Sequence, residues 1–271
     1  MRRALAAALL SIWTACAPTP MPRPGDYHGS DADVSVTRLA HAGVILEMGR
    51  HRFLLDPWLY GGLLIRQREA LGLHPDGFPG ASAVLLTHDD GTHADPTALT
   101  RLARVVPTLV APPPLAERLT ADGFREVRGL AWWNDTTVDG VRITAVPARG
   151  NGYLIRAEDL VVYAAGDGSD AAAFAEVRRV AGRIDVALLP IGERRVLGVR
   201  TDMGPDQAAA AAAVLGARRV IPIAYGATGV FPFVTFAGDP VPRFRRAAAA
   251  AGVEARSIVV LEPGESWHYY R

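Results

Sequence analysis

Two histidines and two aspartates lie within six consecutive residues, His88–His93, and their side chains are of the types that bind metal ions. This segment follows the aliphatic run Val84–Leu86 and ends just before Asp95 and Pro96. Imidazole nitrogens and carboxylate oxygens are common ligands of zinc, manganese and iron. The spacing therefore indicates a metal-binding loop at the end of a buried strand.

The two residues after this loop predict where the next helix begins. Asp95 is suited to accept hydrogen bonds from the first free N–H groups of a helix, and Pro96 is suited to the first helical position. A polar loop between a strand and a helix is where open α/β sheets place their ligands. We therefore expect the His88–His93 segment to lie at the edge of a sheet.

From residue 33 onward, short aliphatic segments alternate with helical ones. Two half-chains, each a run of strands followed by strand–helix units, predict two sheets packed face to face with helices outside. The predicted strands are 34–39, 44–48, 52–55, 108–111, 141–146, 152–156, 160–164, 186–189, 220–223 and 257–261. The predicted helices are 96–104, 113–122, 170–180, 204–215 and 242–251.

Five short motifs occur in an order that resembles the metallo-β-lactamase superfamily, in particular the branch with ascorbate-phosphate lactonases and the phospholipase D that acts on N-acyl-phosphatidylethanolamine. This resemblance covers nearly all of residues 33–265 and implies an α+β fold, a four-layer αββα sandwich, for a domain at 33–271. Thr201–Pro205 and Leu261–Glu265 also look like that branch. The five motifs are Leu39–Gly43, Asp56-Pro57, the His88 loop, Ala165–Asp167 and Ile221–Gly226.

The resemblance implies a set of metal ligands of which only part is present. The family's loop reads His-x-His-x-Asp-His and helps to hold two metal ions with a bridging hydroxide. His88 and His93 match it, whereas Asp90 stands at the second histidine and Thr92 at the aspartate. Asp167 matches the carboxylate that bridges both ions.

Two further histidines of the family pattern are missing. Arg149, Gly150 and Asn151 occupy the place of one, and Ala224 occupies the place of the other. A centre with two ions is therefore not expected. The remaining metal ligands would be His88, Asp90, His93 and Asp167, around one divalent ion, zinc first, with manganese or iron as alternatives.

With such an ion, the resemblance implies a metal-dependent hydrolase of an ester-type bond, a phosphodiester or a lactone. The substrate would be a small or lipid-like molecule. Asp90 and His93 would be the catalytic side chains beside the ion, with His93 as a weak ligand or proton shuttle. Arg149 and Asp202 are candidate substrate-binding residues, and we expect His41 to be a structural residue near the site.

The alternative is a non-catalytic relative, without metal, that binds a ligand or partner in the eroded pocket. In that case Arg149 would replace the charge of the ion by pairing with Asp167 or Asp90. His88 and His93 would then hydrogen-bond to loop backbone, and Asp90 would stabilise the turn at Gly91.

The charge composition gives no indication of a nucleic-acid partner. The 29 basic and 28 acidic residues leave a net charge of +1, and basic residues are concentrated only in short pairs. Arg194-Arg195 and Arg245-Arg246 are such pairs, and we expect them on solvated faces.

The first residues resemble an export signal. A basic start, Met1–Arg3, precedes an apolar stretch that is too short to span a bilayer, and Trp13–Cys16 resembles a lipoprotein box. We therefore expect residues 1–16 to be a signal segment, 17–32 a Pro/Gly-rich spacer, and Cys16 a lipidation site. The product would be exported, either periplasmic or anchored to the membrane through Cys16. If the true start is Met21, it would be cytoplasmic.

Overall fold

The computed structural model describes residues 31–62, 64–73 and 80–270. The signal segment, Cys16, the alternative start at Met21 and nearly all of the spacer lie outside the described residues. None of the helices in the described part is long and apolar enough to cross a membrane.

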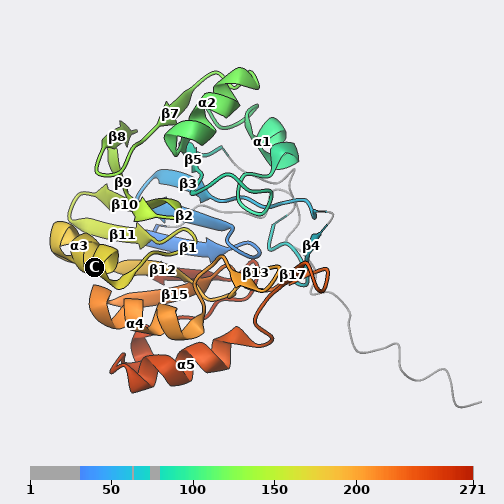
Figure 1. Ribbon diagram of the computed structural model, residues 1–271. Helices are drawn as coiled ribbons and strands as arrows, with labels where there is room; N and C mark the ends of the chain where they lie inside the picture. Colours follow the sequence, from blue (N-terminus) through green and yellow to red (C-terminus); the bar gives the residue numbers. More distant parts are fainter. Residues whose placement is uncertain (1–30, 63, 74–79, 271) are drawn as a thin grey trace, which may run out of the picture.

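Two mixed sheets form the centre of the molecule (Figure 1). The first has seven strands in the order β18 (Ser266–Tyr269), β1 (Val34–Arg38), β2 (Val44–Met48), β3 (His51–Leu55), β5 (Ala83–Leu85), β6 (Thr108–Ala111) and β7 (Val127–Gly129). The second has six strands in the order β15 (Arg219–Ile223), β12 (Val186–Pro190), β11 (Leu160–Ala164), β10 (Gly150–Ala157), β9 (Val141–Ala148) and β8 (Asp135–Val138).

Helices cover the outer face of each sheet. The first sheet packs on α1 (Pro96–Leu102) and α2 (Pro113–Ala121), and the second on α3 (Ala171–Ala181), α4 (Pro205–Leu215) and α5 (Pro240–Ala250). A third apolar cluster fills the space between the two sheets, with Phe53, Ile143 and Tyr153 fully buried in it. This arrangement is the expected αββα sandwich, because each sheet buries one face on its partner and the other on helices.

Two small sheets extend this framework on the side of the site loops. β13 (Arg195–Val196) pairs with β14 (Val199–Arg200) and with β17 (Val234–Thr235). β16 (Ala227–Gly229) pairs with β4 (Ile65–Gln67). The sequence pattern did not predict these strands, since segments of two or three residues carry no readable alternation.

The predicted strand at 257–261 is wrong. Ala255–Ser257 form a 3₁₀ turn, Ile258 makes only an isolated bridge to Val220, and the last strand is β18. Ile258 and Leu261 are nevertheless buried. The aliphatic run therefore indicated burial correctly, but a buried run need not join a ladder.

Parallel pairing brings the ends of several strands to one edge of the sandwich. β3, β5 and β6 are parallel neighbours in the first sheet, and β11, β12 and β15 are parallel neighbours in the second. The segments that leave β3, β5, β11 and β12 carry Asp56, His88, Asp167 and Arg194. Open α/β sheets bind ligands at this carboxyl edge.

Candidate functional site

A chain of three polar residues, Asp56, Thr87 and His88, anchors the loop after β5. The Asp56 carboxylate accepts hydrogen bonds from the Thr87 N–H at 2.8 Å and from the Thr87 hydroxyl at 2.7 Å. The hydroxyl proton is thus used, so Thr87 Oγ1, 2.9 Å from His88 Nδ1, accepts from that ring nitrogen. Such a relay fixes the ring so that His88 Nε2 points into the site.

The helix that follows begins as predicted. The Asp95 carboxylate accepts from the N–H groups of Thr97 and Ala98, and Pro96 is the first helical residue. The other oxygen of the Asp95 carboxylate accepts hydrogen bonds from the backbone N–H groups of Leu59 and Tyr60. Asp95 therefore holds the loop after β3 against the start of α1, which closes one side of the site.

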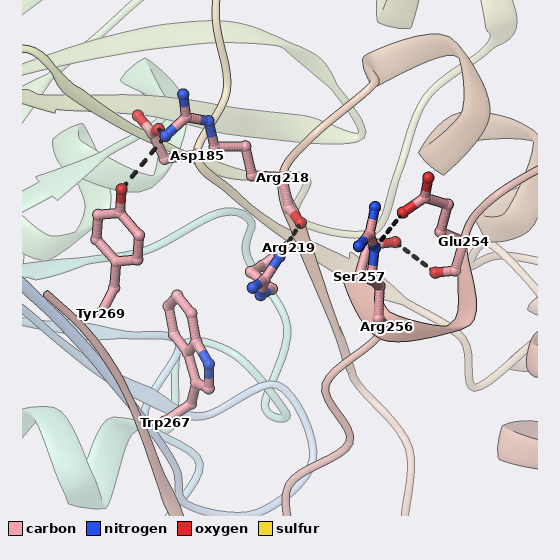
Figure 2. Close-up of a pocket in the computed structure, with 8 residues that line it drawn as sticks. All are labelled: Asp185, Arg218, Arg219, Glu254, Arg256, Ser257, Trp267 and Tyr269. Atoms are coloured by element: carbon pink, nitrogen blue, oxygen red, sulfur yellow. Dashed lines mark hydrogen bonds and ion pairs between the residues drawn. The ribbon is translucent and has the colours of Figure 1, made fainter. Parts of the chain in front are cut away.

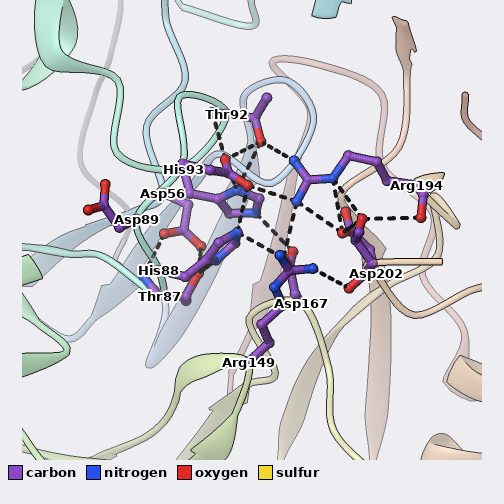
Figure 3. A network of polar contacts seen from close by, with 12 residues as sticks. Asp56, Thr87, His88, Asp89, Thr92, His93, Arg149, Asp167, Arg194 and Asp202 are labelled. Carbon is purple, nitrogen blue, oxygen red and sulfur yellow. Dashed lines mark hydrogen bonds and ion pairs between the residues drawn. The ribbon is translucent and has the colours of Figure 1, made fainter. Parts of the chain in front are cut away.

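Four side chains meet above this anchor (Figure 3). His88 Nε2 lies 2.8 Å from Asp167 Oδ2 and 3.0 Å from Asp90 Oδ2. His93 Nδ1 lies 3.0 Å from Asp90 Oδ1, and its Nε2 lies 3.3 Å from Asp167 Oδ1. His88, Asp90 and His93 each have a ligand atom within 4.8 Å of the ligand atoms of the other two. This spacing could hold a metal ion. The structure thus brings together all four predicted ligands.

A fifth side chain, which the sequence did not single out, enters this cluster. Arg194 reaches in from the side opposite the two histidines (Figure 3). Its Nη2 lies 2.7 Å from Asp90 Oδ2, 3.4 Å from Asp167 Oδ2 and 3.0 Å from Asp202 Oδ1. Arg194 is only 4% exposed. The expectation that Arg194 lies on a solvated face is therefore wrong, because three carboxylates compensate its burial.

The predicted pairing of Arg149 with Asp167 or Asp90 is also wrong. Arg149 is exposed, and its guanidinium donates to the Thr201 carbonyl at 2.9 Å. The cation that contacts both carboxylates is Arg194. An arginine does neutralise these carboxylates, but it is Arg194 and not the predicted Arg149. The chain beyond β12 returns over the site and brings Arg194 there. The predicted role of Arg149 in substrate binding is not tested by these contacts.

Asp202 serves Arg194 in the structure. It is 4% exposed, and it accepts hydrogen bonds from Arg194 Nε at 3.0 Å and from the Thr201 hydroxyl at 2.8 Å. Burial and the nearby charge of Asp167 raise the pKa of Asp202 to about 6. These contacts define Asp202 as a residue that positions the guanidinium, while its predicted contact with a substrate stays a prediction.

The electrostatics of the cluster favour a protonated His88 beside ionised aspartates. Burial acts to lower the pKa of His88, but the charges of Asp167 and Asp90 and the hydrogen bonds with both together raise this pKa to about 10. Burial likewise opposes ionisation of Asp90, yet hydrogen bonds from His88 and His93 hold its pKa well below the ordinary range. The raised pKa favours the imidazolium form of His88, in which both ring nitrogens donate.

Packing closes Gly150, one of the three residues at the place of a missing family histidine. A side chain at Gly150 would place its Cβ 2.2 Å from the Thr87 carbonyl oxygen and 2.7 Å from the His88 Cβ. The neighbouring Asn151 is buried and donates to the Leu130 carbonyl. Ala224 is buried in the cluster between the sheets. No imidazole could enter at Gly150 without movement of the His88 loop.

His41 lies beside the cluster as the expected structural residue. Its ring packs edge-on against Trp58, His93 and Phe236, with ring centroids 5.3–5.9 Å apart. Both ring nitrogens are buried without a hydrogen-bond partner. Burial and the charge of His93 lower the pKa of His41 to about 3, which keeps the ring neutral.

A second hollow, of about 330 Å³, lies away from this cluster (Figure 2). Its cationic side chains have partners of their own: Arg256 lies 2.5 Å from Glu254, and Arg218 lies 3.7 Å from Asp185. Arg219 donates to the Arg218 carbonyl. The cationic side chains of this hollow are therefore already engaged by neighbouring residues.

The fold and the site define a class of protein, and comparisons identify the family. The β-lactamase superfamily domain matches residues 51–225. A UPF0173 metal-dependent hydrolase from Pyrococcus furiosus is 33% identical over 249 residues, which cover 86% of this chain and 98% of the relative. One from Pyrococcus horikoshii is 31% identical with the same coverage. The chain belongs to the metallo-β-lactamase superfamily, and within it to the UPF0173 family of metal-dependent hydrolases.

Solved structures share this fold. Igni18, a metallohydrolase from Ignicoccus hospitalis, is 23% identical with a TM-score of 0.66, over 88% of this chain and 99% of that one. An isothiocyanate hydrolase from Delia radicum gut bacteria is 18% identical with a TM-score of 0.69, over 87% of this chain and 99% of that one. At these identities the likeness shows the fold alone.

As the side chains lie, a guanidinium stands where a metal ion would need carboxylate oxygens. Atoms that share one zinc ion each lie about 2.0–2.2 Å from it and face it with a lone pair. Here Arg194 Nη2 contacts the oxygens of Asp90 and Asp167 that an ion would need. A divalent ion would have to displace the guanidinium.

Proposed function

We propose that this protein is a metal-independent member of its hydrolase family, in which Arg194 and protonated His88 take over the charge of the metal ion. The site then binds a ligand and does not hydrolyse it through a metal-activated water. The observation that carries this proposal is the contact of one guanidinium nitrogen, Arg194 Nη2, with Asp90, Asp167 and Asp202.

The ligand would enter from the side where the cluster reaches solvent. Asp90 has 27% of its side chain exposed, whereas Asp167 has none. Arg149 is exposed, lies beside the cluster in Figure 3 and donates to the Thr201 carbonyl. A small or lipid-like molecule with an anionic group and a hydrogen-bond donor fits this pair of exposed charges, since Arg149 binds the anion and Asp90 accepts from the donor.

The second candidate is the hydrolase predicted from the sequence, with one ion and an ester-type substrate. One observation favours it. His93 Nε2 and Asp167 Oδ1 are both buried without a hydrogen-bond partner and face each other at 3.3 Å. A metal ion is one group that satisfies two such atoms, so these residues, with His88 and Asp90, would hold it. The ion would supply Lewis acidity and an activated water.

Elemental analysis of protein purified without chelator separates the two. The metal-free proposal predicts less than about 0.1 ion of zinc, manganese or iron per chain, because structural and catalytic sites otherwise retain their metal through purification. Asp167→Ala is the control and should leave this value unchanged. About one ion per chain in the wild type, lost in Asp167→Ala, would overturn the proposal in favour of the metal-dependent hydrolase.

A further inference from the structure

Exposed apolar side chains gather beside the site in three segments that are distant in sequence. Seven of the 13 large hydrophobic side chains exposed in the described chain lie in 64–68, 195–200 and 230–233. Phe231 is 82% exposed, Leu197 70% and Val199 68%. We call apolar rim these seven residues: Leu64, Val196, Leu197, Val199, Val230, Phe231 and Phe233.

Backbone hydrogen bonds join these segments into one surface. The Leu197 N–H donates to the Phe233 carbonyl at 2.8 Å, and the Val230 N–H donates to the Leu64 carbonyl at 3.0 Å. β13 pairs with β17, and β16 pairs with β4, so the three segments stay together. Figure 1 shows β4, β13 and β17 gathered at one side of the molecule, away from α3. Main-chain hydrogen bonds therefore hold the rim together as one surface.

Arginine side chains flank the apolar rim. Residues 64–68 and 195–200 contain Arg66, Arg68, Arg195 and Arg200 and no acidic residue, and of these arginines Arg195 pairs with Glu193 outside the segment. The stretch 227–238 carries no charge at all. Arg66, Arg68 and Arg200 are exposed. Apolar side chains at loop tips with arginines beside them are suited to an anionic bilayer, where the tips enter the acyl boundary and the cations meet the headgroups.

We propose that the apolar rim docks this protein onto the surface of an anionic phospholipid membrane. A second copy of the chain fits the surface less well, because a two-fold interface would bring the same arginines together with no acidic partner in these segments. A lipid on Cys16, as predicted from the sequence, would add the second membrane signal that stable anchoring needs.

Docking through this surface would bring the membrane next to the site. The β13–β14 hairpin leaves the site at Arg194 and returns to it at Thr201 and Asp202. The apolar tip at Leu197 is thus attached on both sides to the charged cluster. This proposal goes beyond the metal-free function and does not depend on it, because the rim contains none of the candidate metal ligands.

The test uses the full chain with Cys16→Ser, so that no lipid is attached, in flotation with vesicles of phosphatidylcholine containing about 30% phosphatidylglycerol. The rim variant adds Leu197→Asp and Phe231→Asp. The matched control adds Val105→Asp and Tyr270→Asp, which remove one aliphatic and one aromatic side chain, exposed by 50% and 63%, outside the three segments. All three proteins keep the same N-terminal segment, so its own affinity cancels.

We expect the parent and the control to float with anionic vesicles and the rim variant to bind at least about tenfold more weakly, with all three weaker on pure phosphatidylcholine. Unchanged thermal midpoints would show that the variants are folded. Equal binding of the rim variant and the control would overturn the proposal. It would also be overturned if the parent did not bind anionic vesicles. A dimer in light scattering that the rim variant dissociates would then assign the surface to a second copy of the chain.

Discussion

Arg194 Nη2 lies 2.7 Å from Asp90 Oδ2, inside the cluster of His88, Asp90 and His93 whose spacing could hold a metal ion. The same nitrogen reaches Asp167 and Asp202. Three carboxylates thus surround one buried guanidinium, which occupies the centre of the network. Most consequences of the metal-free account depend on this contact.

Loss of the guanidinium should destabilise the fold. Arg194→Ala leaves Asp90, Asp167 and Asp202 without their cation, and removal of one partner of a buried ion pair costs about 3–5 kcal/mol. Urea unfolding at pH 7 measures this. The neighbouring Arg195, partly exposed and paired with Glu193, is the matched control, and its replacement by Ala should cost less than about 1 kcal/mol. Equal losses for the two variants would contradict the buried network.

Stability should fall in mildly alkaline solution. The folded-state pKa of His88, about 10, is above its ordinary value of 6.5. Its contribution is therefore complete below pH 6.5 and is lost as the pH rises toward 10. The free energy of unfolding, measured from pH 6 to pH 10, should decline in the parent and decline less in His88→Gln. Identical slopes for the two proteins would show that His88 is not an imidazolium in the folded state.

Gly150 should not tolerate any side chain, although it lies in the segment where the family pattern has a histidine. Gly150→Ala should cost more than about 2 kcal/mol, because the added Cβ meets the Thr87 carbonyl oxygen at 2.2 Å and the φ of +78° is already unfavourable. Gly123 has a φ of +93° with open space around it, so Gly123→Ala should cost only about 1 kcal/mol. Thermal unfolding of both variants measures the difference. Similar costs would mean that the His88 loop yields easily and that a lost ligand could be restored there.

Replacement of His41 should leave the free energy of unfolding unchanged or increase it. Its buried ring nitrogens have no hydrogen-bond partners, so His41→Phe removes unsatisfied polar atoms while keeping a planar ring. We expect a change in unfolding free energy between about zero and +1 kcal/mol of added stability. A loss above about 2 kcal/mol would show that His41 makes a polar interaction essential to the fold.

Periodicity predicted two sheets packed face to face with helices outside, because it reports burial. The meeting of His88, Asp90, His93 and Asp167 was implied by the resemblance to the metallo-β-lactamase superfamily. Both failed at Arg194. A buried arginine has no local signal of its own, since its burial depends on carboxylates from three other segments. The short strands β13 and β14, which return the chain to the site, also lack any alternation that a pattern could detect.

Zinc titration of the metal-free parent beside Arg194→Ala and Arg194→Gln tests the central claim most directly, with equilibrium dialysis as the measurement. We predict no saturable binding to the parent up to about 10 μM zinc, and a gain of at least about tenfold in affinity for both variants, because the freed carboxylates and imidazoles then face an ion without a competing cation. One zinc ion bound tightly by the parent, with equal or weaker binding by both variants, would contradict the replacement of the metal by Arg194.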